Sequence, residues 1–286
     1  ISKRLIDAYQ SFPQDALKLV TVVPSNLREE KVVGWTAVGQ LRPVKEKADY
    51  LELVPPDEKT VSVVNTKQGG LISITREDIK FDQTGKLMGI ASTVGQRAAQ
   101  YRESIIMKKA IDRDSDAYNK AQLYKTNDSN KNYLATAASA IGTTGWEKAH
   151  IKLMEQVDEQ SEPIWVMGDR PIMMVPPRSY PTALKLKLND YGPQGTANLD
   201  VNLAKNAFDI VINPYYASLT STTKWHYGAF AREFVWSEVW PLEVSSRTSP
   251  DSEDNFKRDI VLQVKAGFYA GCGAIDTLYV IENAGA

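Results

Sequence analysis

One uninterrupted pattern, from Val61 to Arg113, constrains the fold of this chain more than any other feature. It begins as a β-rich run, VSVVNTKQGGLISITREDIKFDQTG, and passes directly into a helical run, KLMGIASTVGQRAAQYRESIIMKKAIDR. Apolar residues in the second run recur at steps near three and four, which predicts a helix with one buried stripe. The predicted stripe consists of Leu87, Ile90, Ala91, Val94, Ala98, Tyr101, Ile105 and Ala110. At ~1.5 Å per residue the helix would be about 40 Å long, so we interpret it as a spine for other elements.

Length and charge exclude several classes of protein. With 286 residues, 43% of them hydrophobic, the chain can bury the core of one large domain or two subdomains. Its formal charge of −1 lacks the basic excess of a protein that grips nucleic acid, so we expect only weak, non-specific contact with DNA. The single cysteine, Cys272, excludes an intrachain disulfide and favours a reducing cytoplasm. No apolar run approaches the ~18–20 residues of a membrane span, so no membrane partner is expected.

The first 76 residues indicate an arm and a projecting ribbon. Residues 1–31 combine a short helical pattern with two prolines and carry little core of their own, as in an arm that lies on something else. Four strand-like runs follow, separated by charged or Pro-rich turns: VVGWTAVGQL, DYLELV, TVSVV and GLISIT. A ribbon of this length has too little apolar surface to be stable alone. The pattern therefore predicts an extended loop that packs on a partner.

The region from about Leu134 predicts a compact α/β unit. Thr144 and Glu147 have the spacing of a capping box, and a further helix is predicted from Ser179, with Pro181 in its first turn. The runs PIWVMG, RPIMMVPP and FDIVINP are typical of buried strands, which completes a β-α-β alternation. Two later runs, WHYGAFAREFVWSEVWPLEVSS and FKRDIVLQVKAGFYAG, predict long strands that return to the sheet beside the spine helix.

Residue patterns typical of catalysis are missing from the sequence. His150 lies on an apolar helix face, where a partly buried histidine with a local hydrogen bond is expected, and His226 is interpreted as a strand residue. No GxSxG elbow places a nucleophile. Gly69-Gly70 and Gly271 to Gly273 lack the lysine of a phosphate loop and are interpreted as turns or bulges. We therefore predict no enzyme activity, no cofactor and no metal site.

Three stretches, in this order, resemble tailed-bacteriophage major capsid proteins, above all the Mu-like major head subunit family. The run GGLISITREDIKFDQTGKLMGIASTVGQRAAQYRE is similar to the stretch that joins the extended loop of that family to its spine helix. The run IMMVPPRSYPTALKLK, followed by FDIVINP and WHYGAF, resembles its helix that begins after Val-Pro-Pro and its next strands. The run FKRDIVLQVKAGFYAGCGAIDTLYV is similar to its closing strands. The resemblance implies an α+β chain with the Hong Kong 97-type capsid fold.

The same resemblance implies a domain plan and a function. It places an N-terminal arm at 1–31, an extended β-hairpin loop at 32–76, a peripheral domain with spine helix and β-sheet at 77–133 and 224–268, and an α/β axial domain at 134–223 and 269–286. The implied function is that of a structural major capsid protein. Its copies would self-assemble, as pentamers and hexamers, into a procapsid and then the icosahedral head shell around double-stranded DNA. Assembly would take place in the host bacterial cytoplasm, with portal, scaffold or protease and decoration proteins as further partners.

Two loops are the predicted contact sites. Charged residues at the tips of the extended loop are expected to face a neighbouring subunit and set its docking register: Arg42, Lys45, Glu46, Lys47, Asp57 and Glu58. A polar axial loop is expected near a symmetry axis, with Asp190, Tyr191, Gly192 and Asp200. Some relatives join their subunits by a Lys–Asn isopeptide bond. Lys45, Lys47, Lys59 and Lys67 lie in the loop region without a motif for such a pair, so no cross-link is predicted.

Two other functions stay open on the sequence. An encapsulin-type nanocompartment shell would share the fold and hold enzymes instead of a genome, and copurified DNA or neighbouring portal and protease genes would separate it from a phage head. A soluble enzyme with an unrecognised site rests only on the α/β pattern of the axial region. A monodisperse monomer with a well-formed pocket would favour that alternative.

Overall fold

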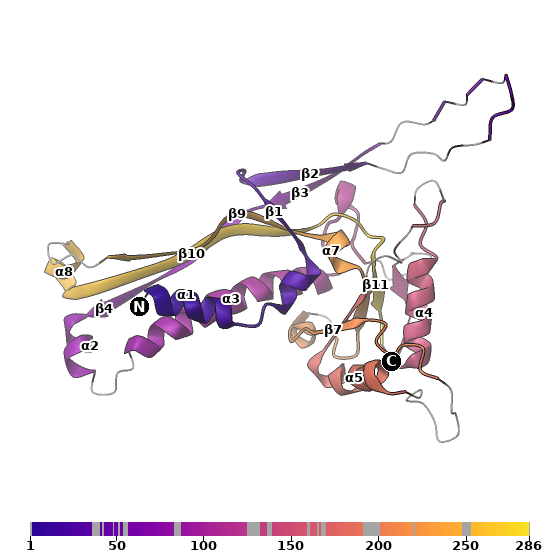
Figure 1. Ribbon diagram of the computed structural model, residues 1–286. Coiled ribbons are helices and arrows are strands. Elements are labelled where there is room, and N and C mark those ends of the chain that lie inside the picture. The colour runs from indigo at the N-terminus through magenta and orange to yellow at the C-terminus, as the bar shows by residue number, and fades with distance from the viewer. Residues whose placement is uncertain are drawn as a thin grey trace.

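A computed structural model describes the chain at residues 2–35, 41, 43–47, 49–50, 52–53, 57–82, 87–124, 132–135, 139–158, 161–164, 166, 170–190, 201–219, 221–247 and 253–285. Its strands form a four-stranded sheet, a five-stranded sheet and a two-stranded hairpin. Figure 1 shows the four-stranded sheet as an elongated layer, the five-stranded sheet at one end of it, and the hairpin projecting beyond the body. The predicted α+β fold class is confirmed.

The four-stranded sheet carries the long dimension of the molecule. Its order is β1 (Thr21–Pro24), β9 (Phe234–Arg247), β10 (Ile260–Ala274) and β4 (Thr66–Thr75). β10 pairs antiparallel with both β9 and β4, whereas β1 runs parallel to β9. The long helix α3 (Leu87–Ile111) lies along one face, with α1 (Ser2–Ser11) packed on it (Figure 1). The arm therefore lies on the spine helix of its own chain.

The predicted spine helix is confirmed, but its buried stripe is rotated by about one residue. Ala91, Ala99, Ile106 and Ala110 are buried, whereas Tyr101 is 48% exposed and Ile90 is exposed as well. Val94, Ala98 and Ile105 are half-buried, and the Leu87 side chain lies outside the described residues. The physical reason is α1: an added Cβ at Gly95 would lie 2.2 Å from the Leu5 carbonyl oxygen, so α1 packs on the small residues of α3.

We expect Gly95→Ala to destabilise the subunit by about 1–3 kcal/mol, because the new methyl group meets the backbone of α1 and cannot be accommodated by a side-chain rotation. Gly89→Ala is the matched control in the same helix, since no atom lies within 4 Å of its added Cβ. That change should stabilise the helix by roughly 0.5–1 kcal/mol through propensity. Urea unfolding of both variants checks the pair, and equal effects would contradict the packing of α1.

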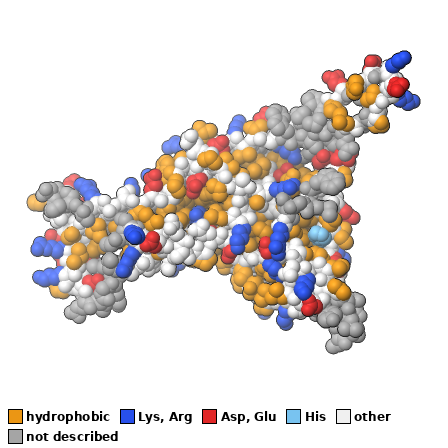
Figure 2. All heavy atoms as spheres, viewed as in Figure 1, with side chains coloured by type: hydrophobic (Ala, Val, Ile, Leu, Met, Phe, Trp, Pro, Cys, Tyr) orange, Lys and Arg blue, Asp and Glu red, His pale blue; other side chains and the backbone are white. Residues whose placement is uncertain are grey.

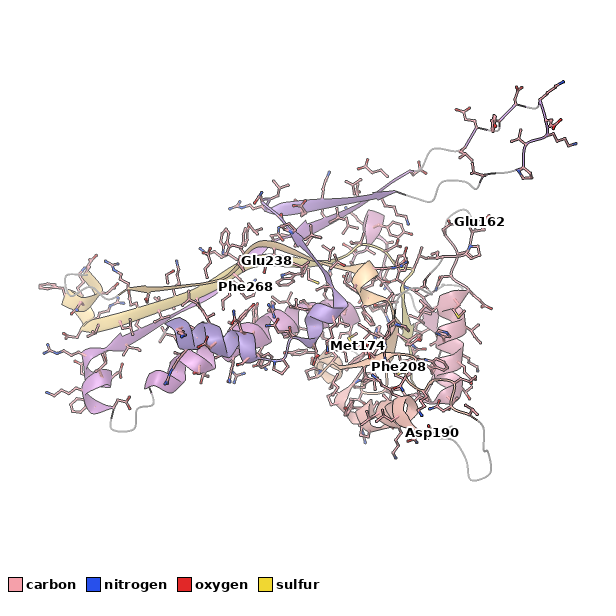
Figure 3. The ribbon with its side chains drawn as sticks, in the orientation of Figure 1. Glu162, Met174, Asp190, Phe208, Glu238 and Phe268 are labelled. Atoms are coloured by element: carbon pink, nitrogen blue, oxygen red, sulfur yellow. The ribbon has the colours of Figure 1, made fainter. Side chains whose placement is uncertain are left out.

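The five-stranded sheet has a hydrophobic core on each face. Its order is β5 (Tyr133–Leu134), β11 (Val280–Asn283), β8 (Trp225–Gly228), β6 (Ile172–Val175) and β7 (Asp209–Ile212). Met174 packs with the spine helix cluster, whereas its neighbour Met173 packs with Phe208 and α4 (Thr143–Met154). Figure 3 labels Met174 and Phe208 in this layer, and Phe268 on β10 of the other sheet. β6 and β7 are parallel and joined through α5 (Tyr180–Leu188), which confirms the predicted β-α-β unit.

Several local predictions are wrong in detail. The capping box at Thr144 is not formed, because α4 begins two residues earlier than predicted: its N-cap is Gly142 and Thr143 is its first residue. The run PIWVMG contains no strand among its described residues, although Pro163 forms an isolated bridge with Val157. Of DYLELV, the described residues 49–50 and 52–53 are not in a strand either. Phe256 lies in a short helix, α8 (Glu253–Arg258), and β10 begins only at Ile260.

The run from Trp225 to Ser246 divides between the two sheets. Gly228 has φ 156°, and an added Cβ would lie 2.1 Å from the Tyr279 carbonyl oxygen, so the chain turns where only glycine fits. One helical turn, α7 (Phe230–Glu233), then separates β8 from β9. The remaining short elements are η1 (Asp15–Leu19), α2 (Arg76–Phe81), η2 (Tyr118–Lys120), η4 (Pro177–Ser179) and α6 (Tyr216–Leu219).

The projecting hairpin consists of β2 (Glu29–Trp35) and β3 (Glu58–Val64), paired antiparallel. Its base crosses β10 at two glycines. An added Cβ at Gly271 would lie 2.5 Å from the Val64 carbonyl oxygen, and one at Gly273 would lie 2.4 Å from Val63 Cγ2. The interpretation of these glycines as turn or bulge is therefore wrong: they lie inside a strand and permit the hairpin to sit close on it. Gly69 and Gly70 likewise lie inside β4.

Candidate assembly surfaces

The tip of the hairpin presents charged side chains to solvent in the isolated subunit. Lys45, Glu46 and Lys47 are exposed, and Lys47 adopts a positive φ of 63°. Asp57 and Glu58, at the start of β3, are exposed as well, whereas Arg42 lies outside the described residues. The described tip residues lie well away from both sheets (Figure 1). Their exposure makes these charges available for contact with another copy. That they face a neighbouring subunit stays a prediction.

The tip also exposes large apolar side chains that the sequence reasoning did not single out. Leu41 is 88% exposed and Tyr50 is 89% exposed. Scattered apolar residues on a surface are ordinary, but a projecting segment with an exposed leucine and tyrosine beside mixed charges is typical of a contact surface. Leu41 ends the run VVGWTAVGQL and Tyr50 belongs to DYLELV, and both runs were interpreted as strands instead.

The outer face of the four-stranded sheet, opposite α1 and α3, contains a hollow of ≈ 430 Å³. Its floor is formed where Gly69 of β4 pairs with Gly267 of β10. Leu71, Trp240, Lys67, Lys265 and Glu243 surround it. Trp240 also packs on Tyr269, with ring centroids 4.8 Å apart. Mixed charges around an apolar floor fit a protein contact better than a phosphate backbone.

The end of the body farthest from the five-stranded sheet carries two exposed aromatic residues. Phe256 of α8 is 93% exposed and Phe81 of α2 is 71% exposed. The two short helices are held together by a backbone hydrogen bond from Arg76 to Asp259, 2.9 Å long. Figure 1 shows both helices at this end. The sequence signal was a phenylalanine inside a charged segment, EDNFKR, which was interpreted as the start of a strand.

Hydrogen bonds join the two ends of the predicted axial loop at its base. Asn202 donates its side-chain N–H groups to the carbonyl oxygens of Leu186 and Asn189, at 2.6 and 2.9 Å, and its backbone N–H to that of Asp190, at 3.0 Å. Lys205 also forms an ion pair with Asp190. Asp190 is exposed beyond the end of α5 (Figure 3), whereas Tyr191, Gly192 and Asp200 lie outside the described residues. The position of this loop at a symmetry axis stays a prediction.

A buried cluster of charges links the end of the spine helix to the five-stranded sheet. Glu282 of β11, 1% exposed, accepts hydrogen bonds from the guanidinium of Arg113, which follows α3, and lies 3.0 Å from Lys224 Nζ. Burial alone would raise the pKa of Glu282, but the Arg113 hydrogen bond and the nearby positive charges hold it below its usual value. Glu233, also fully buried, has a pKa well above its usual value because of burial and repulsion from Asp276. Glu233 accepts the backbone N–H groups of Tyr279 and Val280.

Both histidines occupy the structural positions predicted for them. His150 is half-buried, stacks on Trp146 and lies 3.0 Å from the Tyr227 hydroxyl. His226 is fully buried in β8, with Nδ1 2.5 Å from the Tyr216 hydroxyl. That hydroxyl donates to the Met174 carbonyl oxygen, so His226 Nδ1 is the donor to Tyr216. Nε2 has no hydrogen-bond partner among the described residues.

Burial lowers the pKa of His226 to about 4. A histidine with a depressed folded-state pKa stabilises the fold fully above its unfolded pKa of ~6.5, and this contribution is lost as the pH falls through about 4. We expect a loss of about 3 kcal/mol from this residue across that range. His226→Asn keeps a donor and removes the titration, so its unfolding free energy should fall less steeply between pH 7 and pH 4. Identical slopes in urea titrations of the two proteins would contradict the assignment.

Within the described ranges, no three His, Cys, Asp or Glu side chains come together as a metal ion would require. None of the described helices is both long and apolar enough to cross a membrane. Figure 2 shows Lys, Arg, Asp and Glu side chains mixed with hydrophobic ones over the visible face, without a continuous basic field.

Comparisons with known proteins agree on one class. A protein-family model described as phage capsid protein matches residues 57–283. The fold is similar to the capsid of a native GTA particle, with 12% identity, 94% of this chain and 89% of that chain covered, and a TM-score of 0.61. It is similar to the capsid of cyanophage P-SCSP1u, with 11% identity, 93% and 86% covered, and a TM-score of 0.61.

A third solved structure with the same fold is a virus-like particle from Pyrococcus furiosus, with 10% identity, 99% of this chain and 96% of that chain covered, and a TM-score of 0.55. At the sequence level, no curated protein matches the chain. The structural matches, at this low identity, identify the fold as the Hong Kong 97 type.

Proposed function

We propose, from the premise that this chain belongs to the phage capsid protein family, that its copies build the icosahedral head of a tailed bacteriophage around double-stranded DNA. The family match over residues 57–283 carries this conclusion, because it spans α3, β3, the five-stranded sheet and three strands of the four-stranded sheet. The chain is a major capsid shell protein with the Hong Kong 97-type fold, and it is located in the virion capsid. Its proposed role is structural and includes no catalytic step.

Self-assembly is supported by the projecting tip of the hairpin. A two-stranded ribbon does not hold its shape without packing, yet its described tip lies away from both sheets (Figure 1). In a shell built from one chain, a projecting segment can dock on the next copy, and a closed arrangement of such contacts forms a ring. We propose pentamers and hexamers, with Lys45, Glu46, Lys47, Asp57 and Glu58 at the contacts between copies.

The domain plan is part of the proposal. The sheets support two adjustments to the predicted boundaries. β8 at 225–228 belongs to the five-stranded sheet, and β10 extends to Ala274 in the four-stranded sheet. We therefore assign the four-stranded sheet with α1 and α3 to the peripheral domain and the five-stranded sheet with α4 and α5 to the axial domain. The axial loop beyond Asp190 would then gather around the symmetry axes.

The subfamily of the chain, its place of assembly and its partner proteins are also part of the proposal. The resemblance of three sequence stretches favours the Mu-like major head subunit family, with assembly in the host cytoplasm and with portal, scaffold or protease and decoration proteins as partners. The formal charge of −1 supports weak contact with packaged DNA, since each phosphate contact adds salt-dependent affinity.

A nanocompartment shell is the second candidate, and one observation favours it: the similarity to the virus-like particle from Pyrococcus furiosus.

Sedimentation of the purified protein over a range of concentration and salt tests both candidates. We expect fast-sedimenting, closed particles, and nucleic acid inside particles isolated from infected cells. Protein cargo in place of nucleic acid would favour the nanocompartment. A monomer under every condition would contradict both.

A further inference from the structure

A lysine occupies a position on the hairpin where the burial pattern calls for an apolar residue. Along β3 the inward-facing residues are Lys59, Val61 and Val63, all of them buried. Val61 and Val63 pack against Val235 of β9 and anchor the base of the hairpin. Lys59 is the buried residue of β3 closest to the tip of the hairpin. The hairpin projects from the body beyond the base of β3 (Figure 1).

The Lys59 ammonium is held by two groups from separate segments. It lies 4.4 Å from the centroid of the Tyr118 ring, which belongs to η2 after the spine helix. It also lies 3.6 Å from Asp276 Oδ2, in the connection between β10 and β11. The lysine side chain is only 8% exposed and that of Asp276 is 16% exposed. A cation between an aromatic ring face and a carboxylate is restricted in position, because both contacts weaken when the ammonium moves away from the ring face or from the carboxylate oxygen.

Stability alone does not account for a buried lysine here. Moving an ammonium out of water costs free energy that one ion pair repays only in part, and an apolar residue of similar volume is often as stabilising. Methionine at this position would extend the apolar row of Val61 and Val63. What methionine could not supply is a contact that depends on direction, because apolar packing tolerates small rotations that a charged contact does not.

We propose that Lys59 is a positioning residue for shell assembly: its ammonium, held by Tyr118 and Asp276, fixes the direction in which the hairpin leaves the body. This inference rests on the proposed function, in which the hairpin contacts another copy. Asp49 at the tip is ten residues from Lys59 and can lie up to about 35 Å beyond it. A tilt of about 10° at Lys59 would move such a tip by about 6 Å, enough to separate charges that meet at hydrogen-bond distance.

Lys59→Met tests the proposal, with Lys59→Arg as the conservative variant and Lys31→Met as the control. Lys31 is an exposed lysine on the other strand of the same hairpin. Spin labels at Glu46→Cys and Lys265→Cys, in a Cys272→Ala background, report the distance from tip to body. The distance is measured in subunits kept below the concentration at which shells form.

We expect Lys59→Met to broaden the tip-to-body distance distribution and to raise the protein concentration needed for shells about tenfold. The unfolding midpoint should fall as well, because Asp276 loses the lysine charge beside it, so both measurements are made at a temperature where the variant is folded. Lys59→Arg should restore a narrow distribution and normal assembly, and Lys31→Met should leave both unchanged. A narrow distribution with normal shells for Lys59→Met would overturn the proposal. So would a Lys59→Arg variant that behaves like Lys59→Met.

Asp276→Asn is the second variant if Lys59→Met does not fold. Asp276 Oδ1 accepts the Thr277 backbone N–H at 2.7 Å, which an asparagine can still do. The variant removes the charge that faces Lys59, and with it the repulsion that raises the pKa of Glu233. It should broaden the distance distribution in the same way, and an unchanged distribution would overturn the proposal. The two inferences fail separately: an unmutated protein that forms no shells contradicts the proposed function, while the distance measurement still decides the role of Lys59.

Discussion

Replacing residues 41–56 by a short Gly-Ser turn should give a folded, soluble subunit that forms no shells. The described residues in this segment lie away from both sheets (Figure 1), so their removal should change the free energy of unfolding by less than about 0.5 kcal/mol. Their loss removes the exposed Leu41 and Tyr50 together with the charged tip, which is the contact surface proposed for the neighbouring copy. Sedimentation and thermal unfolding of the same sample measure the two effects.

A variant that changes only the charges of the tip separates two effects of the hairpin, the alignment of neighbouring copies and the strength of their contact. Exposed ion pairs are individually worth roughly 0–1 kcal/mol, so changing Lys45, Glu46 and Lys47 to alanine should weaken assembly and change its salt dependence without abolishing it. Normal particles from the deletion variant would contradict the proposed role of the hairpin. Loss of folding in that variant would show instead that the tip packs on its own subunit.

The second large effect is expected at Glu282. Glu282→Gln keeps the shape of the side chain and removes the charge that partners Arg113 and Lys224. Breaking a buried pair leaves uncompensated charge, and we expect a loss of about 3–5 kcal/mol in the free energy of unfolding. Because Arg113 follows the spine helix and Glu282 belongs to the five-stranded sheet, the variant should also loosen the packing of the helix end on that sheet. Hydrogen exchange at β11 would report that loosening.

Asp209 offers a matched control. It too lies between two cations, with Lys187 at 3.0 Å and Arg170 at 3.3 Å, but its side chain is 48% exposed. Asp209→Asn should therefore cost less than about 1 kcal/mol, because water screens and replaces the lost contacts. Equal losses for Glu282→Gln and Asp209→Asn in urea unfolding would contradict the view that burial makes the Glu282 cluster important.

The elements that the sequence predicted well are those decided by local chemistry. α5 begins after Ser179 with Pro181 in its first turn, and its two flanking strands, β6 and β7, are short apolar runs between turn residues. The spine helix was predicted to within a few residues because its period extends over seven turns. The order of such elements, together with the resemblance of three stretches, was enough to predict the fold class.

The errors occurred where distant segments decide the local structure. The buried side of α3 depends on α1 lying over Gly95, which periodicity alone does not reveal. The division of the run from Trp225 to Ser246 depends on Gly228, whose missing side chain permits the close approach of Tyr279. Gly271 and Gly273 likewise permit β3 to cross β10. In each case a small residue permits close contact with a segment that is far away in the sequence. A single sequence does not show which segment that is.

The candidate contact sites were predictable in part for the same reason. The charged tip of the hairpin follows from composition, whereas the hollow over Gly69 and Gly267 requires the pairing of β4 with β10. Lys59 was recognised only as one lysine among several in the loop region. Its burial against Tyr118 and Asp276 depends on two segments far along the chain, so its role is visible only in the folded subunit.

A reconstruction of the purified particles by electron cryomicroscopy tests the central claim most directly. The account predicts closed icosahedral shells in which each hairpin lies on a neighbouring copy and the five-stranded sheets, with the loop after Asp190, gather in fives and sixes around the symmetry axes. Open aggregates, a monomer, or shells whose hairpins fold back on their own subunit would contradict it.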